Sequence, residues 1–159
     1  MTNITGKLFQ NIQTRKITPF RYDPSKQDYY KLIREAQEKG YSQSIITSDI
    51  MISLIEHFLL KHKVIITNIE FLVEDSDLTS EIDFILNKLR ENAAYWEILK
   101  NKLQFLSTDS CIEIKKIDIN CMDHVALVSI YVNGVFSVTE NMYDAVAYEL
   151  SSIVEDHVQ

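Results

Sequence analysis

The sequence predicts an α+β protein in which a mainly antiparallel sheet of about four strands packs against helices. Three observations indicate this fold class. Apolar residues recur at helical spacing over residues 78–106 and alternate with polar residues over residues 64–73. An Asn-Gly pair, Asn133-Gly134, separates two segments rich in β-formers, as in a β-hairpin. The expected fold has two N-terminal helices, a long central helix and a C-terminal helix.

The N-terminal quarter divides into an arm and a helix. Residues 1–22 show no clear period, so we expect a basic, irregular arm followed by a single α+β domain over residues 23–159. The first helix is expected to begin at Asp23, which is placed as its cap, with Pro24 at the first helical position. It ends at Gly40, where a left-handed residue is favoured.

A second helix and a strand follow. Thr47 or Ser48 is placed to cap the helix, whose apolar residues recur at helical spacing as far as Leu59. Residues Val64–Val73 then change period, which predicts a strand with one buried face. The acidic turn Glu74–Asp77 leads into the central helix.

Three strands and a helix are expected in the C-terminal third. Cys111–Ile119 reads as a strand whose phase slips at Lys115-Lys116, which predicts a bulge or bend. His124–Val132 and Val135–Val138 form the hairpin, for which Asn-Gly favours a type I′ turn. A terminal helix capped by Thr139 runs to about Val158.

The central helix is the most informative element. Its apolar seam is Leu78, Ile82, Ile85, Leu89, Trp96, Leu99, Leu103 and Leu106, with Asn92 as the polar member. A continuous helix over these positions would span roughly 43 Å at about 1.5 Å per residue, which would cross the whole domain. A break near Asn92-Ala93-Ala94 is the alternative.

A second apolar cluster, Phe84, Ile98 and Phe105, falls on the opposite side of this helix. Two apolar faces require two layers of cover, the sheet on one side and either the N-terminal helices or a second copy of the chain on the other. The helix is therefore either a buried central helix or a homodimer interface. The candidate partner or dimer interface residues are Phe84, Asn92, Trp96, Ile98 and Phe105.

Composition excludes several classes of protein. Hydrophobic residues make up 46% and charged residues 25%, which is typical of a folded protein rather than a disordered one. No apolar stretch approaches the roughly 18 residues that span a bilayer, and Met1–Gln10 lacks the core of a secretory signal. Cys111 and Cys121 fit a reducing compartment. We therefore expect a cytoplasmic protein without membrane association.

Charge is unevenly distributed along the chain. The net charge is −7, yet residues 1–26 hold five basic residues and one acidic residue, whereas the remainder holds 11 basic and 22 acidic residues. An acidic body repels phosphate backbones, which makes nucleic-acid binding an unfavoured function. The residues that would carry it in the arm are Arg15, Lys16, Arg21 and Lys26.

The sequence contains no recognisable nucleotide or calcium motif. Its three glycines leave no Gly-rich loop, and neither the Walker nor the dinucleotide pattern occurs. The acidic residues from Asp75 onward open like a calcium loop, but Ser80 replaces the required glycine and Leu86 the required glutamate. These acidic side chains fit better as partners of a helix N-terminus. No cofactor is expected.

Zinc and catalytic patterns are also incomplete. Cys121 and His124, with Asp123 between them, supply too few ligands for a structural zinc site, so no metal is expected. Ser53 and His57 lie one helical turn apart, but Ser53 sits within a helix and lacks the strained turn of an activated nucleophile. No catalytic residue is assigned.

The leading hypothesis is a non-enzymatic protein–protein interaction protein of the adaptor, chaperone or inhibitor type. Apolar anchors within an acidic surface suit a basic protein partner. One alternative is a small enzyme whose site is assembled from dispersed residues, Asp123, His124 and Cys121 with Glu70 or Glu113. A second alternative is a nucleic-acid regulatory protein acting through the basic arm. No motif identifies a family.

Overall fold

The chain forms one antiparallel sheet with helices on both of its faces and along one edge, described over residues 2–123 and 125–158 of a computed structural model. In chain order the elements are β1 (Asn3–Asn11), β2 (Ile17–Arg21), α1 (Tyr29–Glu38), β3 (Tyr41–Gln43), α2 (Ser48–Lys61), β4 (Val64–Phe71), α3 (Ser76–Glu91), α4 (Tyr95–Thr108), β5 (Ile114–Cys121), β6 (Ala126–Tyr131), β7 (Val135–Thr139), the 3₁₀ turn η1 (Glu140–Met142) and α5 (Tyr143–Val158).

The sheet has seven strands over the described residues, in the order β2-β1-β7-β6-β5-β4, with β3 pairing to β1 beyond the end of β7. The chain combines helices and an antiparallel sheet, as expected. The prediction of about four strands, with two helices as the first elements of the chain, is wrong. The segment 1–22, expected to be an irregular arm, contributes β1 and β2. Gly6, Lys7, Leu8 and Phe9 of β1 are all buried, so the alternation that marks a half-buried strand is absent.

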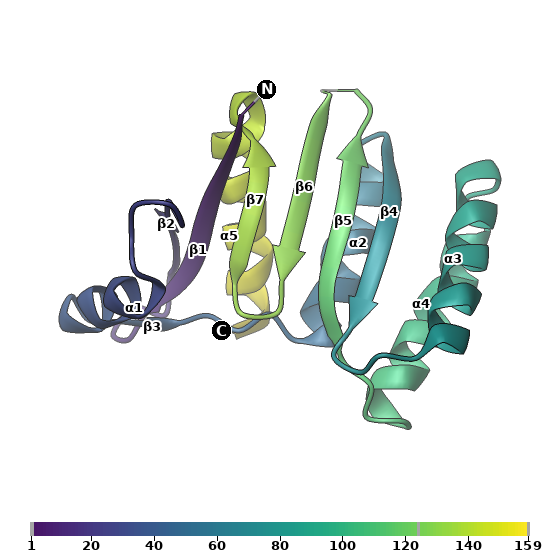
Figure 1. Cartoon of the computed structure of the whole chain (residues 1–159), viewed down its shortest axis with the longest axis horizontal. Coiled ribbons are helices and arrows are strands. Elements are labelled where there is room, and N and C mark those ends of the chain that lie inside the picture. The colour runs from purple at the N-terminus through teal and green to yellow at the C-terminus, as the bar shows by residue number, and fades with distance from the viewer. Residues whose placement is uncertain (1, 124, 159) are drawn as a thin grey trace.

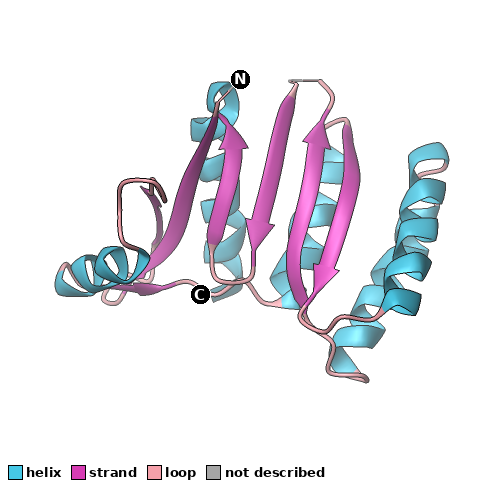
Figure 2. Ribbon diagram, viewed as in Figure 1, coloured by secondary structure: helices cyan, strands magenta, loops and turns pink. Residues whose placement is uncertain are grey.

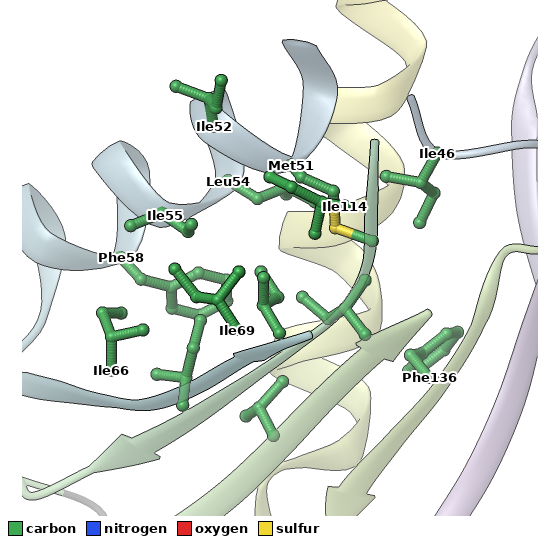
Figure 3. Packing of buried hydrophobic residues seen from close by; sticks show 14 of the residues in the cluster. Ile46, Met51, Ile52, Leu54, Ile55, Phe58, Ile66, Ile69, Ile114 and Phe136 are labelled. Atoms are coloured by element: carbon green, nitrogen blue, oxygen red, sulfur yellow. The ribbon is translucent and has the colours of Figure 1, made fainter. Parts of the chain in front are cut away.

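One face of the sheet is covered by α2 and α5 (Figures 1 and 2). The main apolar core lies between these helices and the sheet, and α3 and α4 extend it past β4. Met51 and Phe58 of α2 contribute large buried side chains that lie over Ile66, Ile69 and Ile114 of the sheet (Figure 3). Burial of this kind is the dominant favourable term in folding.

The opposite face is covered by α1 only near β1, β2 and β3. A second apolar cluster of Phe9, Leu32, Ile33 and Ala36 forms there. Lys7 is fully buried beside it, and its ammonium donates to the Asn133 carbonyl and lies 5.2 Å from the Tyr29 ring centroid. Burial lowers the pKa of Lys7 to about 8.

The rest of this face carries a row of polar side chains. Strand register places five polar residues in one row across β4, β5, β6, β7 and β1: Asn68, Asp118, Ser129, Ser137 and Thr5. The Ser129 hydroxyl donates to Asp118 at 2.6 Å, and the Asn68 amide donates to it at 3.2 Å. The row is therefore a hydrogen-bonded surface rather than a second core.

The first helix starts later than the sequence suggested. Asp28 caps α1 by accepting from the Tyr30 N–H, whereas Asp23 accepts from Ser25 in a separate turn. Gly40 follows the helix with φ of 88°, as expected for a left-handed residue at a helix end.

The central helix is broken into α3 and α4, so the alternative of a break near Asn92 is the one observed. Asn92 leaves helical geometry at φ −147°, and its side chain accepts from the Ala94 N–H at 3.0 Å. The Tyr95 N–H then donates to the Asn92 carbonyl at 3.1 Å as α4 begins. A continuous helix was the wrong expectation because Asn competes for backbone hydrogen bonds.

The predicted bulge and hairpin are both present, but the turn type differs. Lys115 is the extra residue between the pairs Phe71–Ile114 and Glu70–Lys116. In the hairpin the Gly134 N–H donates to the Tyr131 carbonyl, and Gly134 has φ of 84°. Asn133 is not among the described residues with positive φ, so the turn is not type I′. The connection between Tyr131 and Val135 is instead a three-residue loop.

No helix in the described ranges is both long enough and apolar enough to cross a membrane.

Candidate interaction surface

The strand β4 forms an unpaired edge of the sheet. It pairs with β5 on one side and ends the strand order on the other. Its sequence, VIITNIEF, has eight residues with no proline and no lysine, and Glu70 is its sole charged residue. Proline and lysine are the residues that commonly protect edge strands from further pairing, so this edge lacks both.

The register shows which backbone groups of β4 face outward. The Val132 N–H donates to the Lys115 carbonyl, so the backbone groups of Lys115 and of the later odd-numbered residues of β5 point toward β6. The Met122 N–H donates to the Lys63 carbonyl, so the backbone groups of the even-numbered residues, from Lys116 onward, point toward β4. The β4 residues paired with these even-numbered residues direct their own N–H and C=O groups toward β5. Ile66 and Ile69 are paired with odd-numbered residues of β5, so their N–H and C=O groups point away from β5. Within the described chain, no hydrogen bond joins these outward groups to another element.

A groove of about 540 Å³ runs beside the second half of β4. One wall is β4 itself, and the other is the first two turns of α3, where Ser76, Thr79 and Ser80 are small and exposed. Glu70, Glu74 and Asp75 also line it, against a single basic residue, Lys115. The groove therefore combines an unpaired strand edge with an acidic wall.

The acidic character extends along the chain on both sides of the groove. Residues 64–83 contain six acidic side chains and no lysine or arginine. Asp75 caps α3, because its carboxylate accepts from the N–H groups of Asp77 at 3.0 Å and Leu78 at 3.1 Å. Two of the donors at the start of α3 are thus already used, which makes this helix N-terminus a poorer site for an anion.

Helices α3 and α4 carry the three apolar residues expected on the back of the central helix. Phe84 is 60% exposed on α3, and Ile98 and Phe105 are 51% and 52% exposed on α4. The sequence predicted cover for these side chains, by the N-terminal helices or by a second copy of the chain, and the described residues leave at least half of each side chain exposed. Lys88 lies 5.5 Å from the Phe84 ring centroid, which leaves the ring half open to solvent. We call residues 64–108 the β4–α3–α4 end.

The other two interface candidates have structural roles. Asn92 forms the break described above. Trp96 is half-buried, and its indole N–H donates to Glu56 of α2 at 2.9 Å. The Lys100 ammonium lies 2.8 Å from the same Glu56 oxygen, and these two contacts lower the pKa of Glu56. Trp96 and Lys100 therefore fasten α4 to α2.

The opposite edge of the sheet, β2, is closed. The Leu8 N–H of β1 donates to the Gly134 carbonyl, and the Leu8 carbonyl accepts from the Ser44 N–H, so both groups point away from β2. Pro19 of β2 is paired with Leu8, and its backbone nitrogen therefore points to the outer edge of the sheet. Ile17 has the same outward orientation, and its N–H donates to Glu155 of α5 at 2.9 Å. Proline and a capping carboxylate thus remove the donors that an added strand would need.

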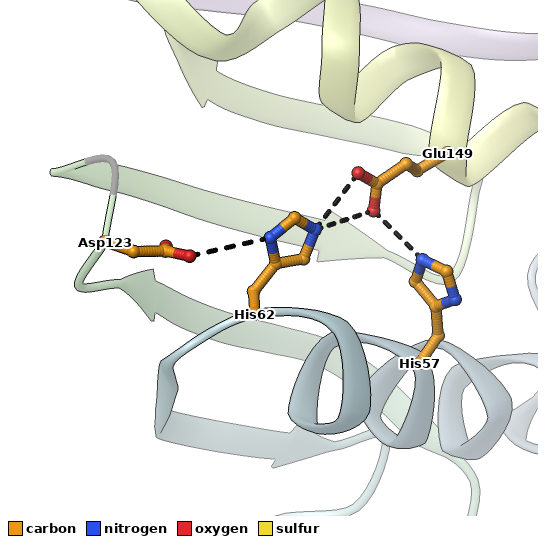
Figure 4. Close-up of polar contacts among 4 residues, drawn as sticks. All are labelled: His57, His62, Asp123 and Glu149. Carbon is orange, nitrogen blue, oxygen red and sulfur yellow. Dashed lines mark hydrogen bonds and ion pairs between the residues drawn. The ribbon is translucent and has the colours of Figure 1, made fainter.

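A polar cluster joins α2, α5 and the turn after β5. The Glu149 carboxylate lies between two imidazoles, 3.0 Å from His57 Nε2 and 3.0 Å from His62 Nε2 (Figure 4). The other ring nitrogen of His62 is 3.9 Å from Asp123. A carboxylate accepts from both rings, which ties the two helices together. Among the described residues no group of three or more His, Cys, Asp or Glu side chains is arranged to hold a metal ion.

Of the residues named for an assembled enzyme site, Cys121 and Asp123 lie near each other at the end of β5, whereas Glu70 and Glu113 lie elsewhere. Cys121 is buried, and burial raises the pKa of its thiol to about 11, which disfavours the nucleophilic thiolate. Glu113 accepts hydrogen bonds from Ser107 at 3.0 Å and from Ser48, and Glu70 lies on β4. His124 lies outside the described residues.

A groove of about 580 Å³ is lined by Ser53, His57 and His157 together with Glu56 and Lys100. Among the described contacts, His57 bonds to Glu149 and no hydrogen bond joins it to Ser53. The Ser-His pair considered from sequence therefore shows no activated hydroxyl.

The basic residues of the N-terminal segment are separated by β2. Arg15 and Lys16 lie in the exposed β1–β2 turn, whereas Arg21 and Lys26 lie at and beyond the other end of the strand. The Arg21 guanidinium is 4.7 Å from the Tyr143 ring centroid and 3.6 Å from Asp144. These four residues do not form one patch.

Sequence reasoning missed the edge of β4 as a functional feature, although the absence of proline and lysine from residues 64–71 was a readable signal. It missed Lys7, Pro19 and Glu155 because β1 and β2 were not recognised as strands. Comparison with protein-family models, with curated proteins and with solved structures finds no match.

Proposed function

We propose that this chain is a non-enzymatic protein–protein interaction protein, an adaptor, chaperone or inhibitor, that binds a basic partner protein through the β4–α3–α4 end. The observation that carries the proposal is the exposure of Phe84, Ile98 and Phe105 on the two helices beside the unpaired edge. Large exposed aromatic and aliphatic side chains on one part of a surface are typical anchors for a partner.

Charge favours a basic partner. The chain has a net charge of −7, and residues 64–83 have six acidic side chains without a basic one. Complementary charge speeds the encounter of two proteins and suppresses wrong partners, while the apolar anchors supply affinity.

The test compares two triple variants in quantitative affinity capture with cross-linking from the source cell. The first replaces Phe84, Ile98 and Phe105 by serine. The matched control replaces Tyr30, Leu60 and Tyr148, which are 73%, 79% and 76% exposed on other elements. All six positions are exposed, so each variant should keep its fold by circular dichroism.

We expect the first variant to reduce recovery of bound partner at least tenfold and the control variant to leave it within twofold. Equal recovery with both variants, or recovery of no partner with the unmodified chain, would contradict the proposal.

A further inference from the structure

We infer that the outer edge of β4 receives an extended, basic segment of the partner, which adds to the sheet as a further antiparallel or parallel strand. This inference rests on the proposed function and specifies how the partner is held. Addition of a strand to an exposed sheet edge is a common mode of peptide recognition, in which the main chain supplies the hydrogen bonds.

The edge has the hydrogen-bonding capacity that this mode requires. The N–H and C=O groups of Ile66 and Ile69 point outward, and no described contact uses them. The strand is eight residues long, which is enough to pair with a segment of about five residues. Each backbone pair formed replaces hydrogen bonds to water and fixes the incoming chain along β4.

The groove between β4 and α3 accommodates the side chains of the incoming segment. Its helix wall is built from Ser76, Thr79 and Ser80, whose small side chains leave the space open. Phe71 is buried at the end of β4 and Val73 is half exposed beside it, so these two side chains give this end of the groove an apolar part. Alternate residues of a strand point to the same side, so one set of side chains enters the groove.

The charges of the groove select a basic segment. Glu70, Glu74 and Asp75 face it against Lys115, which leaves an excess of negative charge. Asp75 already holds two N–H groups at the start of α3, so an acidic segment or a terminal carboxylate finds fewer donors there. A second copy of β4 is disfavoured as the occupant, because pairing would bring two acidic segments 64–83 together.

The experiment selects peptides from a phage-displayed library of random twelve-residue peptides against the full chain. Enriched peptides are expected to carry net positive charge, and their dissociation constants are then measured by fluorescence anisotropy. Ser80→Trp fills the groove from its helix wall, and Glu74→Lys reverses a charge on its rim. Each is expected to weaken binding at least tenfold.

Two control variants match these changes. Ser80→Ala leaves the groove open, and Glu35→Lys reverses an exposed charge on α1, away from β4; both are expected to leave the dissociation constant within twofold. A library that yields no binder, binders without net positive charge, or binding that Ser80→Trp leaves intact would overturn the inference. Dimerisation that Ser80→Trp abolishes, seen by light scattering, would overturn it in favour of a second copy.

Failure of this inference is distinguishable from failure of the proposed function. If partner capture depends on Phe84, Ile98 and Phe105 but tolerates Ser80→Trp, the partner binds the helices and not the strand edge. If capture tolerates both sets of changes, the proposed function itself fails.

Discussion

The two edges of the sheet are built in opposite ways. At the β2 edge, Pro19 removes one outward donor, Glu155 of α5 accepts from Ile17, and the strand has only five residues. At the β4 edge, eight residues without proline leave the outward groups of Ile66 and Ile69 without a described partner, beside an open groove. Exposed edges invite pairing with other chains, and folds usually protect them.

This difference shows that the open edge is not a general property of the sheet. The same chain closes one edge with proline, a carboxylate and a helix, yet keeps small residues on the α3 wall beside the other. The β4 edge, with the groove between it and α3, is therefore where we propose that a further strand is added.

The largest expected change in the free energy of unfolding comes from adding a side chain at Gly6 of β1, next to the closed β2 edge. A Cβ at Gly6 would lie 2.5 Å from both Phe136 Cζ and the Tyr143 hydroxyl oxygen, in a site where the two rings stack. We expect Gly6→Ala to lower the free energy of unfolding by about 3 kcal/mol, as for overpacking of a tight core. Chemical denaturation measures it, and a loss below about 1 kcal/mol would show that the closed end is looser than described.

The second effect is the pH dependence of stability that the burial of Lys7 on β1 produces. The folded pKa of Lys7 is about 8, below the ordinary value of 10.5, so the folded state releases this proton first as pH rises. The unfolded chain then binds more protons between those values, and stability rises with pH in that window. The free energy of unfolding of the unmodified chain minus that of Lys7→Met therefore depends on pH. This difference should increase by about 1.6 kcal/mol between pH 8 and 9.5.

Lys116 is the matched control for this titration. Burial opposes its charge, but Asp118 and Tyr131 together outweigh burial and the pKa of Lys116 is raised. Its stabilising contribution is therefore fully present below 10.5 and is lost only as pH rises through the raised folded value. The difference in the free energy of unfolding between the unmodified chain and Lys116→Met should stay constant between pH 8 and 9.5. If this difference changed with pH in the same way for both lysines, burial would not be what sets the pKa of Lys7.

The third effect opens the closed edge. Glu155→Ala removes the acceptor of the Ile17 N–H, and we expect a loss of about 1.5 kcal/mol, as for a hydrogen bond to a charged group. Glu155→Gln keeps an acceptor and should recover most of this loss in the same denaturation experiment. If alanine and glutamine behave alike, Glu155 does not protect this edge.

The smallest effect comes from filling space at the open edge. Ser80 is exposed on α3 and lines the groove, so Ser80→Trp meets open space rather than a packed ring. We expect the free energy of unfolding to change by less than about 0.5 kcal/mol. A loss as large as that of Gly6→Ala would mean that the groove is packed and unable to accept a strand.

Local signals predicted part of this architecture from the sequence. The alternation of residues 64–73, the slip at Lys115 and the Asn-Gly hairpin led to strands that the structure contains. The sequence left open whether Phe84, Ile98 and Phe105 are covered by the chain's own helices or by a second copy, because helical spacing reports the faces of a helix and not what covers them.

Long-range features of the fold were beyond sequence reasoning. Strand β1 lies in the interior of the sheet, between β2 and β7, and is buried on both faces, so Lys7 and Gly6 concealed it as a strand. The closure of β2 depends on Glu155, which is distant in sequence. The two edges became comparable only when the strand order was known.

The most direct test of the open edge is residue-resolved amide hydrogen exchange by NMR, with and without a basic peptide selected by the library. We expect exchange of the Ile66 and Ile69 amides to slow at least tenfold on binding, while that of Ile17 at the closed edge is unchanged. Unchanged exchange at Ile66 and Ile69 in the saturated complex, or slowing at Ile17 instead, would contradict this expectation.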